Sequence, residues 1–104
     1  MKTLIIDTSK SSEVVVSLQV DSEMYQEKVE NAPHSAQQVL PLIEKLLKDR
    51  KIAKEELTEI QVNCGPGSFT GLRVGVSIAN MLGTLLQIPI NNNKPGEPVE
   101  PFYE

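Results

Sequence analysis

The sequence predicts a single α/β domain: a mixed β-sheet with the element order β-β-β-α-β-α-β and two main helices. Three features of the sequence predict this fold. Strand-like apolar runs follow one another over residues 3–30, and apolar residues then recur at helical intervals over 35–49. Finally, a short strand leads through a glycine-rich turn into an apolar helix over 60–86. Because this order mixes hairpins with a crossover, we expect helices packed against the sheet.

The first three strands are predicted from β-branched and alternating residues. Residues 3–8 form a short apolar run, residues 13–20 are rich in valine, and residues 24–30 alternate as an edge strand does. Turn-forming residues separate the three runs. We therefore expect an antiparallel start to the sheet.

An amphipathic helix of about 15 residues is predicted from Ser35 onward. Ser35 stands three residues before Gln38, which is the spacing of a capping box. Pro41 lies inside the helix and is expected to bend or weaken it. The apolar positions at helical spacing are Ala36, Val39, Leu40, Ile43, Leu46 and Leu47.

The second half of the chain predicts a strand over 60–64, a helix over about 72–86 and a short last strand over 88–90. From Asn91 onward Asn, Pro, Lys, Gly and Glu predominate, so no packed element is predicted there. We therefore divide the sequence into a domain over residues 1–90 and an extended polar tail over residues 91–104.

Composition argues against several classes of protein. A length of 104 residues suits one domain. The net charge of -4, with basic residues scattered along the sequence, argues against a chain that grips nucleic acid alone. Cys64 is the single cysteine, which excludes an intrachain disulfide and fits a reducing cytoplasm. No apolar stretch approaches the roughly 20 residues of a membrane span, and the first apolar run is too short for a signal peptide.

A glycine-rich turn between the fourth strand and the second helix is the strongest candidate for binding chemistry. Backbone N–H groups in such a turn can hold an anion at a helix N-terminus. The spacing of Gly65, Gly67 and Gly71 matches neither a Walker loop nor a dinucleotide fingerprint. The alternative interpretation is a tight turn that lets the helix pack closely on the sheet. At the end of the first strand, Asp7-Thr8-Ser9 is similar to a phosphate loop, although a lone Asp there more often caps a turn.

Small residues recur at every fourth position of the second predicted helix, at Gly71, Gly75, Ala79 and Gly83. Glycine inside a helix costs about 1 kcal/mol relative to alanine, so a close approach should offset it. That approach is either to the domain's own sheet or to another chain, and the pattern leaves both open.

Candidate catalytic residues are few. His34 is the only histidine, so a histidine-rich metal site is excluded, and Ser68, His34 and Asp7 form the only conceivable triad. We expect His34 to make local hydrogen bonds near the helix start and Cys64 to be buried and inert.

Residues 64–75 resemble the signature of the TsaB (YeaZ) family. The signature loop consists of Gly65, Pro66, Gly67, Ser68, Phe69, Thr70, Gly71, Leu72 and Arg73. Three further segments resemble the family in order and spacing: Ile5 to Ser9, His34-Ser35 followed by Val39 to Ile43, and Leu86 to Ile90. The resemblance covers residues 1 to about 90.

This resemblance implies an actin-like ATPase (ribonuclease H-like) subdomain and a non-catalytic partner subunit in the synthesis of tRNA threonylcarbamoyladenosine. By the same resemblance the chain docks onto a TsaD-type catalytic subunit, joins a TsaE-type ATPase and forms homodimers. ATP and metal are expected on partner subunits, and tRNA is reached only through the complex, in the cytoplasm and away from any membrane. The implied partner-binding residues are Val39, Leu40, Ile43, Leu47, Leu72, Gly75, Val76, Ala79 and Gly83.

The sequence departs from the family in corresponding to only the first of its two subdomains. The nucleotide cleft of the fold lies between subdomains, so Asp7, Thr8 and Ser9 are interpreted as a vestigial phosphate loop. Two alternatives stay open: a weak nucleotide-binding module, and a glycoprotease-like hydrolase.

Overall fold

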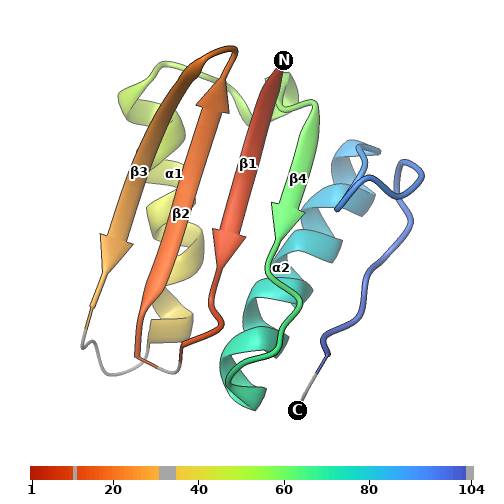
Figure 1. The fold of residues 1–104 in the computed structure, drawn as a ribbon. Helices are drawn as coiled ribbons and strands as arrows, with labels where there is room; N and C mark the ends of the chain where they lie inside the picture. Colours follow the sequence, from red (N-terminus) through yellow and green to blue (C-terminus); the bar gives the residue numbers. More distant parts are fainter. Residues whose placement is uncertain (11, 31–34, 103–104) are drawn as a thin grey trace.

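The computed structural model describes residues 1–10, 12–30 and 35–102, which form a four-stranded sheet with two helices on one face (Figure 1). The sheet order is β3-β2-β1-β4. The strands are β1 (Lys2–Asp7), β2 (Val14–Val20), β3 (Glu23–Val29) and β4 (Glu59–Val62). The helices are α1 (Val39–Asp49) and α2 (Phe69–Leu86), with short 3₁₀ turns at Ser35–Gln38 and Lys54–Glu56. The predicted α/β class and mixed sheet are confirmed.

Strand register places the core on the helix side of the sheet. β1 pairs antiparallel with β2 and parallel with β4, so Leu4 lies beside Leu18 on one side and Ile60 on the other. All three side chains are fully buried. α1 contacts β2 and β3, whereas α2 contacts β1 and β4. With only two Phe, two Tyr and no Trp in the chain, this core is built mainly from Val, Ile and Leu.

The helix boundaries differ from those predicted. A 3₁₀ turn precedes α1, so Pro41 is the third residue of the α-helix, where a backbone N–H is not required within the helix. The predicted mid-helix proline is therefore a first-turn proline. α2 begins at Phe69, because the Ser68 hydroxyl accepts a hydrogen bond from the Gly71 N–H at 3.2 Å and caps the helix. His34 and the side chain of Ser35 lie outside the described residues.

The small-residue stripe of α2 packs against its own domain. A Cβ atom on Gly71 would overlap the Thr8 carbonyl oxygen, and one on Gly75 would overlap the Thr8 hydroxyl. Further along the helix, a Cβ on Gly83 would overlap Ile90. Thr8 is itself buried and donates to the Gly71 carbonyl at 2.5 Å. Of the two interpretations of the stripe, the structure therefore supports close packing on the sheet.

Contrary to the expectation from the sequence, one apolar stretch is long enough for a membrane span: α2 passes by length and composition alone, with 18 residues of mean hydropathy 1.3. The core helix of a globular domain passes the same test. The contacts of α2 with β1 and β4, and its glycines against Thr8, identify it as such a core helix.

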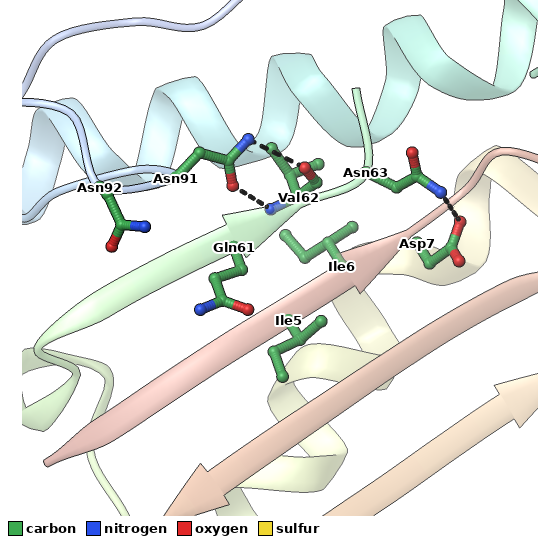
Figure 2. A pocket seen from close by; sticks show the side chains of 8 residues that line it. All are labelled: Ile5, Ile6, Asp7, Gln61, Val62, Asn63, Asn91 and Asn92. Atoms are coloured by element: carbon green, nitrogen blue, oxygen red, sulfur yellow. Dashed lines mark hydrogen bonds between the residues drawn. The ribbon is translucent and has the colours of Figure 1, made fainter. Parts of the chain in front are cut away.

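The outer edge of β4 is covered by a bridge and a side chain, where the sequence predicted a strand over 88–90. Ile90 makes an isolated parallel bridge to Ile60. Beyond it, the Asn91 side chain replaces a peptide group: its Oδ1 accepts from the Val62 N–H at 2.8 Å, and its Nδ2 donates to the Val62 carbonyl at 3.0 Å (Figure 2). Asn91 has a left-handed φ of 51°. Backbone pairing with β4 therefore ends at Ile90, and the Asn91 side chain continues the hydrogen bonding as far as Val62.

Residues 97–102 run beside α2 without regular secondary structure (Figure 1). Val99 packs against the core, and its N–H and carbonyl both bond the Asn80 carboxamide at 2.9 Å. The Phe102 N–H donates to the Cys64 carbonyl at 2.5 Å. This segment thus packs on the domain, which its polar composition did not predict.

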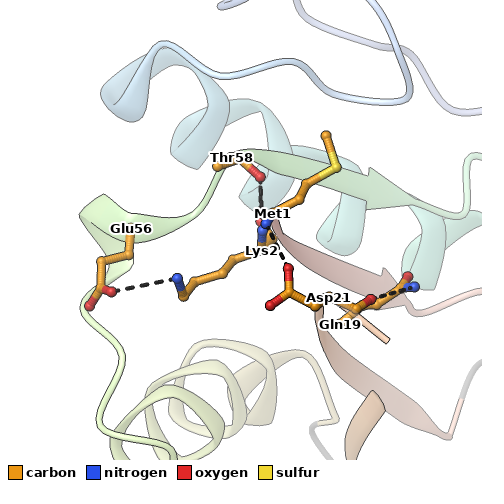
Figure 3. A network of polar contacts seen from close by, with 6 residues as sticks. All are labelled: Met1, Lys2, Gln19, Asp21, Glu56 and Thr58. Carbon is orange, nitrogen blue, oxygen red and sulfur yellow. Dashed lines mark hydrogen bonds and ion pairs between the residues drawn. The ribbon is translucent and has the colours of Figure 1, made fainter. Parts of the chain in front are cut away.

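The first residues join two parts of the sheet (Figure 3). The Met1 ammonium lies 3.2 Å from Asp21 Oδ1 in the turn after β2. The Lys2 N–H donates to the Thr58 hydroxyl at 3.0 Å, just before β4, and Lys2 Nζ lies 3.8 Å from Glu56. Exposed ion pairs of this kind contribute little to stability. The Lys2–Thr58 hydrogen bonds continue the pairing of β1 with the chain just before β4.

We predict that Gly75→Ala destabilises the protein by about 1–3 kcal/mol, because the new methyl group must displace the buried Thr8 side chain. The better helix propensity of alanine offsets only part of this cost. Urea unfolding monitored by circular dichroism measures the change. Ser77→Ala, on the exposed side of the same helix, is the matched control and should stay within about 0.5 kcal/mol of the parent. A neutral or stabilising Gly75→Ala would show that α2 does not need this close approach.

We also predict that Asn91→Ala costs about 1–3 kcal/mol more than Asn92→Ala, because Val62 loses both partners at the β4 edge. Asn92 is a suitable control, since it is exposed and also left-handed, with φ 66°. Both variants share the backbone cost of placing alanine in that region. Thermal and urea unfolding give the difference. Equal costs for the two variants would mean that the Asn91 side chain contributes nothing as a peptide mimic.

Candidate functional site

Two loops meet where β1 and β4 end, and the Asp7 carboxylate joins them. Asp7 Oδ1 accepts from the Ser9 N–H at 3.0 Å, the Ser9 hydroxyl at 2.7 Å and Asn63 Nδ2 at 3.3 Å. Asp7 therefore closes a turn and links it to the residue after β4. This is the turn-capping role that the sequence left open as the alternative to a phosphate loop.

The glycine-rich loop uses several of its N–H groups within the chain. The Gly65 N–H donates to Asn63 Oδ1 at 2.9 Å, and the Ser68 N–H donates to the Ser9 carbonyl at 2.7 Å. A Cβ on Gly67 would stand 2.7 Å from that same carbonyl oxygen, so glycine permits the contact. The peptide bond between Gly65 and Pro66 is cis. These bonds fasten the signature loop to the Asp7–Ser9 loop and favour the tight-turn interpretation.

A shallow hollow of about 450 Å³ lies beside these loops, on the sheet face away from the helices (Figure 2). Most of its polar groups already have partners in the chain: Asp7 bonds Ser9 and Asn63, and Asn91 bonds Val62. Gln61 and Asn92 complete the polar lining. Among the described residues, no group of three His, Cys, Asp or Glu side chains could hold a metal ion.

Two of the conceivable catalytic groups, Ser68 and Asp7, are engaged in local structure. Ser68 caps α2, Asp7 closes its turn, and His34 lies outside the described residues. Cys64 is half-buried, and this burial raises the pKa of its thiol, an effect that the Asn91 amide bond to Sγ opposes. A raised pKa keeps the thiol protonated near neutral pH, which makes it a poor nucleophile.

An apolar groove of about 260 Å³ lies between α1 and α2, on the surface away from the sheet. Three large apolar side chains at this surface are exposed: Leu40 by 38%, Met81 by 42% and Leu85 by 72%. Glu44 and Lys54 provide charge at the rim. The groove is lined by Leu40, Ile43, Glu44, Leu47, Lys54, Leu57, Met81, Leu82, Leu85 and Leu86.

Of the sequence-predicted partner-binding residues, only Leu40 is exposed. Ile43 and Leu47 form the floor of the groove, with 4% and 7% of their surface exposed. The others are buried inside the domain: Val39, Leu72, Gly75, Val76, Ala79 and Gly83. The small-residue stripe, from which the partner-binding residues Gly75, Ala79 and Gly83 were predicted, is therefore a face of α2 that packs inside the domain.

The exposed face of α2 could have been found from the same spacing of four residues. Phe69, Arg73, Ser77, Met81 and Leu85 form a second stripe, and all five are exposed. Large apolar residues on one stripe and small residues on the other distinguish an outer face from a close-packed one. At the start of the outer stripe, the Arg73 guanidinium lies 5.3 Å from the Phe69 ring centroid, in a cation–π contact.

Comparisons with known proteins agree with this fold and loop. A family model described as TsaD, tRNA N6-adenosine threonylcarbamoyltransferase, matches residues 27–92. The tRNA threonylcarbamoyladenosine biosynthesis protein TsaB of Bacillus subtilis is 34% identical over 91 residues, which are 88% of this chain and 40% of that protein. TsaB of Buchnera aphidicola from Schizaphis graminum is 42% identical over 52 residues, 50% of this chain and 25% of that protein.

Solved structures of YeaZ and of a YeaZ-like protein have the same fold as this chain. YeaZ from Pseudomonas aeruginosa superposes with a TM-score of 0.81 at 29% identity, covering 86% of this chain and 43% of that one. A second solved chain, described as similar to the peptidase YeaZ from Pseudomonas aeruginosa, has a TM-score of 0.78 at 30% identity, covering 86% and 41%. The chain thus spans about two fifths of the length of these longer relatives. On the family match, the sequence identity and the shared actin-like α/β fold together, the chain belongs to the TsaB (YeaZ) family of tRNA threonylcarbamoyladenosine biosynthesis.

Proposed function

We propose that this protein is a non-catalytic partner subunit that docks onto a TsaD-type catalytic subunit through the groove between α1 and α2. The exposed apolar side chains Leu40, Met81 and Leu85 around that groove are the observation that carries the proposal. Leaving Leu85 in water forgoes about 1.5–3 kcal/mol of burial, which a partner would recover. Membership of a family named for tRNA threonylcarbamoyladenosine synthesis supports the identity of that partner.

The groove has the composition of an interface that is buried at its centre. Its floor is apolar, and its charged residues, Glu44 and Lys54, are exposed. An apolar centre with a polar rim is typical of protein–protein interfaces, in which a few large side chains provide most of the affinity. Because the walls are two helices, a helix of the partner that inserts a large apolar side chain suits the groove best.

Binding of tRNA, ATP and metal is assigned in this proposal to the other subunits. The net charge of -4 is unfavourable for direct contacts with phosphates. In this proposal the chain acts beside the tRNA-binding subunit, in the cytoplasm. Asp7 and the N–H groups of Gly65 and Ser68 are already bonded within the chain, which is unfavourable for nucleotide binding. The engaged Ser68 hydroxyl and Asp7 carboxylate are likewise unfavourable for hydrolysis. A TsaE-type ATPase and a second copy of this chain remain predicted partners.

The groove predicts that Leu85→Glu and Met81→Glu each weaken the complex with the TsaD-type subunit by at least about tenfold, because each places a charge in a desolvated apolar contact. Both side chains are exposed in the free chain, so stability should change little. Isothermal titration calorimetry gives the affinity, and circular dichroism confirms the fold.

Gln26→Glu is the matched control, since Gln26 is exposed on β3, away from the groove, and the added charge is the same. It should leave the affinity unchanged. If the parent chain forms no complex at micromolar concentrations, or if all three variants bind like the parent, the proposed docking is wrong. Light-scattering chromatography of the free chain separates self-association through the groove from docking onto the catalytic subunit.

A further inference from the structure

The 97–102 segment is held on the domain as an extended peptide ligand would be. Asn80 binds Val99 through both its carboxamide groups: Nδ2 donates to the Val99 carbonyl and Oδ1 accepts from the Val99 N–H, each at 2.9 Å. Three residues after Val99, the Phe102 N–H donates to the Cys64 carbonyl at 2.5 Å. We call Cys64, Gly65 and Asn80 the tail site. It recognises main-chain groups, as a sheet edge does when a strand is added to it.

The side chains show what sequence the tail site accepts. Val99 is the half-buried residue that packs against the core, whereas Glu97, Pro98, Glu100 and Phe102 are exposed. Gly65 lies so close to the Phe102 carbonyl that a Cβ there would overlap it, so a bare backbone is needed at this point of the site. Pro98 and Pro101 limit the residues before them, Glu97 and Glu100, to extended forms, and each proline has a fixed φ of its own. The site therefore fits an extended segment with a β-branched residue after a proline.

The segment can leave its site without disturbing the sheet. The turns before it are closed by their own bonds, from Asn93 N–H to the Ile90 carbonyl at 3.0 Å and from Glu97 N–H to the Lys94 carbonyl at 3.0 Å. Asn91 covers the β4 edge independently of residues 97–102. With one apolar anchor and three main-chain bonds to the rest of the domain, the segment has few contacts to lose, so we expect it to open before the sheet does.

We propose that the tail site is a binding site for an extended peptide segment of a partner protein, with a β-branched residue after a proline, and that residues 97–102 are its built-in competitor. The proposal does not depend on the α1–α2 groove. The tail site lies on the flank of α2 that carries Asn80, and none of its residues lines the groove. A partner that supplies such a segment displaces residues 97–102 and gains the same three hydrogen bonds.

Fluorescence anisotropy with a labelled Glu-Pro-Val-Glu-Pro-Phe peptide tests the proposal on the 104-residue chain and its variants. In Val99→Asp the charged residue cannot seat in the half-buried position, so the site is left free and the peptide should bind saturably. Binding to the parent chain should be weaker by about tenfold or more, because its own segment competes at a high effective concentration. Combining Val99→Asp with Asn80→Ala should weaken binding by about tenfold through the loss of two hydrogen bonds.

A second peptide, with Asp in place of the Val, is the matched control and should not bind the Val99→Asp chain. Circular dichroism checks that each variant is folded, and Val99→Ser replaces Val99→Asp if the latter is not. The proposal is overturned if the peptide fails to bind the freed site, or if it binds equally well with and without Asn80. Equal binding of the two peptides would overturn it as well.

Discussion

The approach of α2 to the end of β1 is the contact on which the rest of the structure depends. Gly71 and Gly75 leave room for the buried Thr8, whose hydroxyl donates to the Gly71 carbonyl. This contact fixes the height of α2 above the sheet. It thereby determines which α2 side chains are buried, such as Leu72 and Val76. It also determines that Met81 and Leu85 are exposed beside α1. The glycines lower the intrinsic stability of the helix, but they allow the close packing of α2 on the sheet that offsets this loss.

Three asparagine carboxamides make hydrogen bonds at places that lack regular backbone pairing between strands. Asn63 joins the two loops, Asn91 extends the edge of β4, and Asn80 holds the 97–102 segment. A carboxamide carries one acceptor and one donor group in the geometry of a peptide, so it can satisfy a main-chain edge that has no strand beside it. In a short sheet whose last strand has four residues, these side chains keep the edge from standing open.

The sequence predicted the sheet class and both helices because their apolar periods are long and regular. It could not predict that residues 88–90 pair through a single bridge, since that depends on the left-handed turn at Asn91. It also missed the packing of residues 97–102, because Val99 is one apolar residue in a polar run, and its partner Asn80 is an ordinary helix residue. Side-chain partners distant in sequence leave no periodic signal.

Burial of the small-residue face of α2 changes how an interface on this helix must be investigated. Substitutions of Gly75 or Ala79 would disturb the packing on the sheet and so abolish any complex indirectly, whatever surface the partner uses. Loss of binding in such variants would therefore carry no information about docking. Only residues that are exposed in the free chain, such as Leu85 at 72% and Met81 at 42%, can separate the two effects. Since the family match gives no docking surface, exposure in the folded domain decides which residues can mediate recognition.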